Sequence, residues 1–171
     1  MGIGAGLVLA ALAAPGCAPA KPRVVEDTAR GCRYEIPPGW TAFDGEIKSK
    51  STSLATIRVF DLEDAERGFL ARLPDSIVPQ LLDWAKSYYI VEGEPARGAA
   101  TIAGETALEL TYPVRVRPES PPSKLIYWIL RHEDRLYVVR ATFAPGSLEA
   151  DEPAIRAWLT SWSFLAQPAT K

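Results

Sequence analysis

The sequence has few of the residues that carry most metal and covalent chemistry, because its 171 residues include one histidine and two cysteines. Zinc sites are built from clusters of Cys and His, so the chain lacks the usual ligands for one. A Ser, Cys or Thr nucleophile needs a neighbouring base, most often histidine, and His132 is the one histidine available. We therefore expect no metal and no cofactor, and we assign no catalytic residue.

The chain also lacks a surplus of charge and a long apolar run. Nineteen basic and 21 acidic residues give a formal net charge of -2 at pH 7. This balance argues against nucleic-acid binding, which requires a basic surplus to neutralise phosphates. The apolar stretch over residues 1–16 falls short of the roughly 20 residues that a membrane-spanning helix needs. The total length suits one domain preceded by a targeting segment.

Residues 1–16 contain no charged side chain and have the length of a signal-peptide apolar segment. Small residues followed by Cys17 resemble the bacterial lipoprotein signal. The resemblance implies cleavage after Gly16, acylation of Cys17 and a domain held in the cell envelope, where several acyl chains would anchor it strongly. Ala18, rather than Asp, implies the outer membrane, with the domain facing the periplasm. The alternative is ordinary secretion, with cleavage after Ala20.

Beyond the anchor we expect a polar tether over residues 17–30, one domain over 31–165 and a short tail over 166–171. Alternating residues predict strands over 31–36, 54–62, 99–102, 106–117, 124–132 and 136–143. In the strand over 106–117, alternate apolar residues as far as Val116 share one face. Apolar residues on both sides of the strand over 124–132 indicate that it is central and covered on both faces.

Two segments show the apolar spacing of amphipathic helices. The first opens at Asp75 and carries an apolar stripe that ends at Tyr88. The second follows Asp151, which is expected to cap it, with a stripe from Ile155 to Trp162. Hairpin-linked strands with two such helices predict an α+β fold with a central, mainly antiparallel sheet flanked by both helices.

The strand that runs into Ile36-Pro37-Pro38-Gly39-Trp40 resembles the opening of the PsbP-like group, which includes DcrB-type bacterial lipoproteins. The hairpin around residues 102–107 and the ending Ser161-Trp162-Ser163-Phe164 continue the resemblance, which covers most of residues 30–165. It implies a central antiparallel sheet flanked by helices and a binding or accessory role. The group has no shared catalytic residues, so the resemblance implies no active site.

Two features suggest binding. Basic residues gather along the second half of the predicted sheet and would form a patch for anionic headgroups or an acidic envelope protein: Arg115, Arg117, Lys124, Arg131, Arg135 and Arg140. The alternative is that these basic residues lie on ordinary solvated strand faces and form no binding patch. Trp128 and Tyr137 would line an apolar groove if the helices left part of the sheet uncovered, with burial under a helix as the alternative.

We therefore expect a membrane-anchored envelope lipoprotein that acts as a non-enzymatic binding or accessory module. One alternative is a small hydrolase that uses His132 with a nearby hydroxyl, although His132 at a predicted turn is expected to be solvated. Another is a carrier of a hydrophobic ligand near Trp128. Cys32 alternates with Tyr34 in a strand, which favours a buried core thiol.

Overall fold

The computed structural model describes residues 23–61 and 73–166, which form two helices and eleven strands. The elements are β1 (Arg23–Asp27), β2 (Cys32–Ile36), β3 (Thr41–Phe43), β4 (Glu46–Lys48), β5 (Leu54–Asp61), α2 (Leu73–Lys86), β6 (Ile90–Val91), β7 (Ala96–Ile102), β8 (Glu105–Arg115), β9 (Ser123–His132), β10 (Arg135–Thr142), α3 (Leu148–Thr160) and β11 (Ser163–Phe164). Within the described residues, no helix has both the length and the apolar character needed to cross a membrane.

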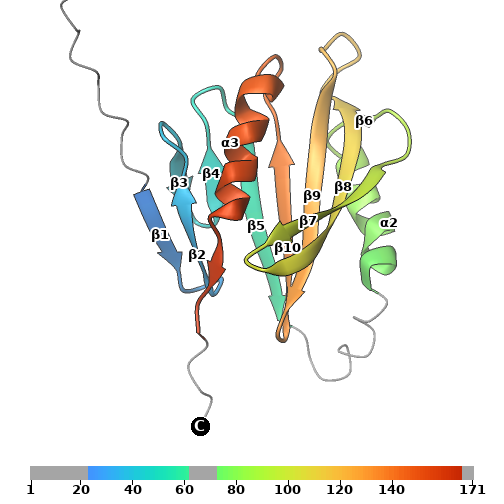
Figure 1. Cartoon of the computed structure of the whole chain (residues 1–171). Coiled ribbons are helices and arrows are strands. Elements are labelled where there is room, and N and C mark those ends of the chain that lie inside the picture. Colours follow the sequence, from blue (N-terminus) through green and yellow to red (C-terminus); the bar gives the residue numbers. More distant parts are fainter. Residues whose placement is uncertain (1–22, 62–72, 167–171) are drawn as a thin grey trace, which may run out of the picture.

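The main sheet runs in the order β3-β4-β5-β10-β9-β8-β6, and β7 also pairs with β8 (Figure 1). A smaller sheet joins β1, β2 and β11. All pairings among the described strands are antiparallel, as hairpin connections require. The expected α+β fold with a central antiparallel sheet flanked by two helices is confirmed.

Strand β9 lies in the middle of the sheet, and its alternate residues enter two separate cores. Ile126, Trp128 and Leu130 belong to the core under α3, to which β2, β4 and β5 also contribute. Leu125, Tyr127 and Ile129 belong to the core under α2, which β8 and β10 complete. The prediction of a central strand covered on both faces is therefore confirmed. We refer to the two sides of the sheet as the α3 face and the α2 face.

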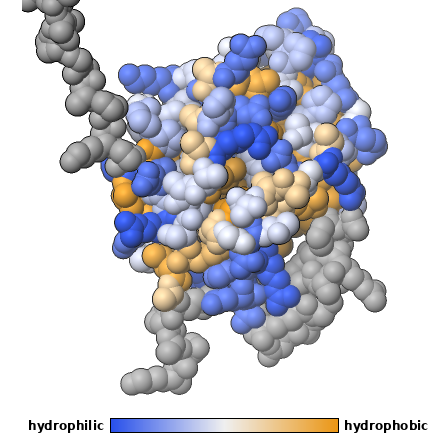
Figure 2. All heavy atoms as spheres, viewed as in Figure 1, coloured by the Kyte–Doolittle hydropathy of each residue, from blue (hydrophilic) through white to orange (hydrophobic). Residues whose placement is uncertain are grey.

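Figure 1 shows how differently the two faces are covered. Helix α3 crosses the front of the sheet beside the smaller sheet, whereas α2 packs behind β8 and β9. In the same view, hydrophilic residues cover much of the front surface and apolar residues form small patches between them (Figure 2). The α3 face is thus covered by a helix together with a second sheet, and the α2 face mainly by one helix.

The structure corrects the expected tether at residues 17–30 from Arg23 on, whereas residues 17–22 lie outside the described residues. Strand β1 pairs with β2 along its whole length, from Arg23 opposite Ile36 to Asp27 opposite Cys32. At the end of β1, the Asp27 carboxylate accepts hydrogen bonds from the Arg30 backbone N–H and guanidinium, both at 3.0 Å. The segment lacks an apolar period because β1 is a largely exposed edge strand, so its sequence resembles a linker.

Several local predictions are also wrong in detail. Helix α2 begins at Leu73 rather than at Asp75, and Tyr88 lies beyond its end with an exposed side chain. Strands β3 and β4 form a short hairpin at the edge of the main sheet, outside the ranges given for the predicted strands. Val116 follows β8 and is exposed instead of continuing its buried face.

Candidate functional site

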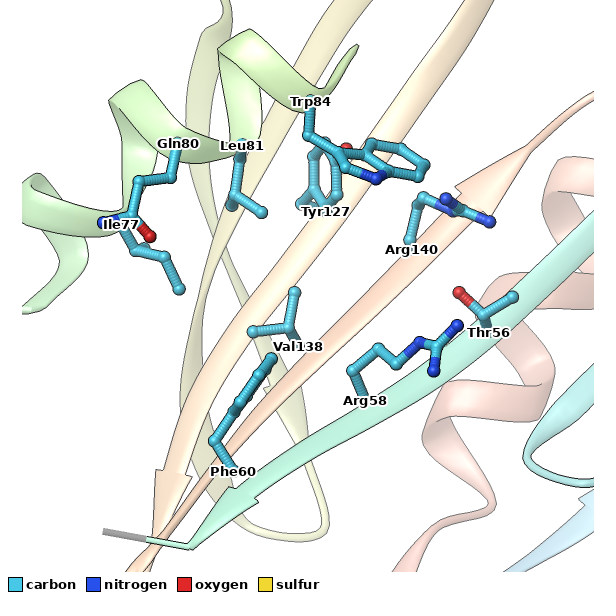
Figure 3. Close-up of a pocket in the computed structure, with 10 residues that line it drawn as sticks. All are labelled: Thr56, Arg58, Phe60, Ile77, Gln80, Leu81, Trp84, Tyr127, Val138 and Arg140. Atoms are coloured by element: carbon cyan, nitrogen blue, oxygen red, sulfur yellow. The ribbon is translucent and has the colours of Figure 1, made fainter. Parts of the chain in front are cut away.

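A groove of about 460 Å³ opens on the α2 face between helix α2 and strand β5 (Figure 3). It exists because the apolar core on this face joins α2 to β8, β9 and β10 but does not extend to β5. Strand β5 instead turns its inward-facing Ala55 and Ile57 toward the α3 face. Its other face lines the groove with Thr56, Arg58 and Phe60. The volume falls within the range of small-molecule sites, roughly 300–1,000 Å³.

Apolar and aromatic side chains form most of the groove. Ile77, Leu81 and Trp84 project from α2, while Tyr127 and Val138 lie on the sheet beneath them. The Trp84 ring meets Tyr127 edge-on at 6.3 Å between ring centroids. Phe60 lines the opposite side and keeps 51% of its surface exposed. An apolar ligand in the groove would therefore remove a large aromatic surface from water.

Two arginines lie at one end of the groove. The Arg140 guanidinium carbon lies 4.2 Å from the centroid of the Trp84 ring, a cation–π arrangement. Its Nε is buried without a hydrogen-bond partner. Burial lowers the pKa of Arg140, and the neighbouring positive charge of Arg58 lowers it further, against the opposing influence of Tyr127, Tyr89 and Glu46. Within residues 23–61 and 73–166, no carboxylate forms an ion pair with either guanidinium.

Within the described residues, the hydroxyls of Tyr127 and the nearby Tyr112 are also buried without a partner, as are the indole nitrogens of Trp158 and Trp162 on the α3 face. The two tyrosine rings meet edge-on, 6.0 Å apart. Burial raises the pKa of Tyr127, so its hydroxyl stays protonated at neutral pH. Unpaired buried polar groups cost stability, and they tend to occur where a ligand or water completes the site.

The apolar groove that we expected at Trp128 and Tyr137 is not there. Both side chains face α3 and the smaller sheet, with 0% and 1% of their surface exposed. Trp128 Nε1 donates to Glu109 Oε2 at 2.7 Å, and the Tyr137 hydroxyl donates to the Arg30 carbonyl at 2.9 Å. The structure therefore shows the alternative, burial under a helix, because α3 and β2 fill the space in front of Trp128.

The basic residues of the predicted patch do not come together. Arg115 pairs with Glu92 at 2.6 Å and Lys124 with Glu152 at 3.2 Å. Arg117 is exposed beyond β8. Arg131 lies near the opposite end of the sheet, where its Nε donates to the Glu133 carbonyl at 2.9 Å, and Arg135 opens β10 next to the same turn. Arg140 lies in the groove. Alternation within each strand directs these side chains to different faces, so the sequence cluster is not a surface cluster.

His132 is not the solvated turn residue that we expected. Its Nδ1 lies 3.2 Å from Glu105 Oε1, and its ring stacks on Phe164 with 3.7 Å between centroids and 6° between planes. The side chain is 25% exposed because β11 returns the chain against it. None of the hydrogen bonds in the described residues joins His132 to a hydroxyl or thiol. This geometry gives the hydrolase alternative no support.

Cys32 is fully buried with a free thiol, which confirms the expected core position. Burial is the main cause that raises its pKa to about 12, so the thiol stays protonated and unreactive. Among the described residues, no group of three or more His, Cys, Asp or Glu side chains is placed to hold a metal ion.

A polar cluster at the start of α3 was missed. Asp151 does not cap the helix, because α3 begins earlier and Ser147 occupies the N-cap position. The buried Asp151 carboxylate instead accepts hydrogen bonds from Ser49 at 3.2 Å and Ser51 at 2.5 Å. Burial pushes its pKa up, but hydrogen bonds from Ser51 and neighbouring serines outweigh that effect and hold the pKa below its ordinary value. The cluster ties the β4–β5 turn to α3.

One feature of the sequence does indicate the groove. Arg140 stands between Val139 and Ala141 in a strand whose other residues are mostly buried. A charged side chain in a buried strand needs an ion-pair partner or contact with water, so Arg140 indicates that the core is open to solvent at this position. Arg58 occupies the equivalent polar position in β5. The pattern of each strand alone does not show that Arg58 and Arg140 lie close together, because this depends on how β5 pairs with β10.

No protein family model and no curated protein matches the sequence. Solved structures do match it. The solution structure of CyanoP, the cyanobacterial PsbP of Synechocystis sp. PCC 6803, superimposes with a TM-score of 0.57 at 13% identity, over 90% of this chain and 98% of that one. The crystal structure of PA94, a protein of unknown function from Pseudomonas aeruginosa, gives 0.50 at 17% identity, over 86% and 99%. At such identities the likeness concerns architecture alone, and on that basis the chain has a PsbP-like fold.

Proposed function

We propose that this protein is a lipid-anchored module of the bacterial cell envelope that binds a small ligand without transforming it. The observation that carries the proposal is the groove between α2 and β5, which combines an apolar lining with two guanidinium groups at one end. The side chains that line it include neither histidine, cysteine nor carboxylate, so it offers cations and apolar surface rather than a nucleophile with its base.

The anchoring part of the proposal rests on the sequence around Cys17. Strand β1 begins at Arg23, six positions after Cys17, so the domain would start within about 20 Å of the acylated residue. Such a short connection would hold the domain against the bilayer surface.

The mass of the mature protein tests the anchor. We expect the protein from the membrane fraction to begin at an acylated Cys17 and the Cys17→Ser variant to lose membrane association. A mature chain that begins at Lys21 without lipid would instead identify a secreted protein.

The binding part is tested by what the purified protein carries. The full protein, extracted from its own membranes, is denatured and the released small molecules are identified by mass spectrometry. We expect one molecule to be released from the wild type and absent from Leu81→Trp, which fills the groove. Asp83→Trp adds the same ring on the exposed side of the same helix and should keep the ligand. Equal release from all three proteins, or none from any, would refute the proposed function.

A further inference from the structure

We infer that the ligand of this groove is a small amphipathic anion, with a carboxylate-type head between Arg58 and Arg140 and an apolar tail along α2. The inference rests on the proposed function, since it names the class of molecule that the same groove takes. It follows from how charge and apolar surface are distributed along the groove.

The two arginines are diagonal neighbours on one face of adjacent strands. In the pairing of β5 with β10, Arg58 lies opposite Val138 and Arg140 opposite Thr56. Diagonal positions of this kind are about 7–8 Å apart, close enough for two long side chains to reach one anion. Figure 3 shows both guanidinium groups beside Thr56 at one end of the groove. The Thr56 hydroxyl is therefore available as a further donor beside the two cations.

The charge at this end is only partly compensated. Glu46 lies on the neighbouring strand opposite Thr56 and on the same face, and its negative charge acts on Arg140 from there. No ion pair or hydrogen bond in the described residues joins Glu46 to either arginine. Two like charges side by side repel, so an anion between them is stabilised by both, whereas a cation would meet two positive groups.

The opposite end of the groove is apolar. Ile77, Leu81, Val138 and Phe60 supply most of its surface, and the exposed Gln80 beside Ile77 adds a neutral polar group without charge. The half-exposed Phe60 ring gains most from cover, because it is a large apolar surface left in water. An ion such as inorganic phosphate would leave this end empty, and an apolar molecule would leave both guanidinium groups without a partner. An amphipathic anion satisfies both ends.

The test compares probes that share one tail. Octanoate, octanol and octylammonium are titrated by calorimetry into the full mature protein in phosphatidylcholine nanodiscs, with empty nanodiscs as the blank. We expect octanoate to bind at least about tenfold more tightly than either other probe, which is the effect of one charge-assisted hydrogen bond. Equal affinities for the three probes would overturn the inference, and so would no measurable binding.

Substitutions then locate the head group. We expect Arg58→Met and Arg140→Met each to weaken octanoate binding about tenfold and to leave octanol binding unchanged. Arg131→Met is the matched control, because Arg131 lies in neighbouring β9 outside the groove, and it should change neither. If Arg131→Met weakened octanoate binding as much as the groove variants do, the preference for octanoate over octanol would come from the overall charge of the protein, and the inference would be overturned.

The groove-filling variant separates this inference from the proposed function. If octanoate and octanol bind alike and Leu81→Trp abolishes both, the anionic class is wrong and the groove remains a binding site. If Leu81→Trp reduces neither, the probes bind elsewhere and this inference fails, while the release experiment decides the proposed function on its own.

Discussion

Each face of the sheet places an arginine over a tryptophan, but the two arginines differ in their hydrogen bonds to carboxylates. Arg156 lies 5.8 Å from the Trp128 ring on the α3 face, and Arg140 lies 4.2 Å from the Trp84 ring on the α2 face. Arg156 donates to both oxygens of Glu109, at 2.9 and 3.0 Å, and also to Glu152. Hydrogen bonds to Glu109 are the main reason that the pKa of Arg156 is raised.

Arg140 has no such carboxylate among the described residues, and its Nε has no partner. The comparison separates two uses of the same side chain. On the α3 face, Arg156 stabilises the fold by covering Trp128 and holding the Glu109 carboxylate to which Trp128 donates. On the α2 face, Arg140 is held in place by Trp84 but keeps its hydrogen-bonding capacity available, as a binding site requires.

The largest expected difference between the faces concerns their tryptophans. Trp158 is 1% exposed and meets Tyr34 and Trp162 edge-on at 5.6 and 5.2 Å. Trp158→Ala should lower the free energy of unfolding by about 3–5 kcal/mol. Trp84 is only half-buried at the groove, so Trp84→Ala should cost about 1–2 kcal/mol. Urea denaturation measures both, and equal losses would mean that the two faces are packed equally well.

The Asp151 cluster should give the α3 face a pH dependence. Asp151→Asn removes the charge that Ser49 and Ser51 stabilise, at an expected cost of about 2 kcal/mol at pH 7. The folded pKa of Asp151 lies below its unfolded value of about 3.9. This contribution is therefore present above about pH 4 and is lost as the pH falls through the folded pKa.

The stability difference between Asp151→Asn and the wild type should accordingly shrink from pH 7 to pH 3, measured by urea unfolding at each pH. Glu149→Gln, at an exposed position in the same turn of α3, is the control. A constant difference across this range would show that the charge of Asp151 contributes nothing to the stability of the fold.

The smallest expected effect comes from the two arginines themselves. Arg156→Met breaks a bidentate pair that is partly exposed, so it should cost about 1 kcal/mol of unfolding free energy. Arg140→Met exchanges a half-buried guanidinium, whose Nε has no hydrogen-bond partner, for an apolar chain, and it should change stability by less than about 0.5 kcal/mol or increase it. A larger loss from Arg140→Met than from Arg156→Met, in the same urea experiment, would reverse the assignment of the two roles.

The fold was largely predictable because its local patterns agree with its tertiary structure. Three features could be read from local residue patterns and agree with the structure. They are the apolar residues on both faces of β9, the turn between His132 and Arg135, and the apolar stripe from Ile155 to Trp162. Strand β1 could not be predicted this way, because an exposed edge strand needs no apolar period. The Asp151 cluster was missed because its serines lie about 100 positions away along the chain.

The candidate site was predicted poorly for a related reason. The sequence pointed to Trp128, a large aromatic residue in a double-sided strand, but it does not state how much of each face a helix covers. That depends on where α2 and α3 rest: α3 packs over Trp128, and α2 leaves β5 uncovered. Of the residues predicted for binding, the structure keeps Arg140 in the groove and adds residues such as Trp84 and Arg58.

The sequence by itself determined the longer strands, the presence of two amphipathic helices, the central position of β9 and the scarcity of reactive side chains, because these follow from residue types and their spacing along the chain. Only the tertiary structure decided which tryptophan is buried, which arginine is paired and where the groove opens. Those outcomes depend on contacts between segments far apart in sequence, such as Arg58 beside Arg140, and no local pattern records them.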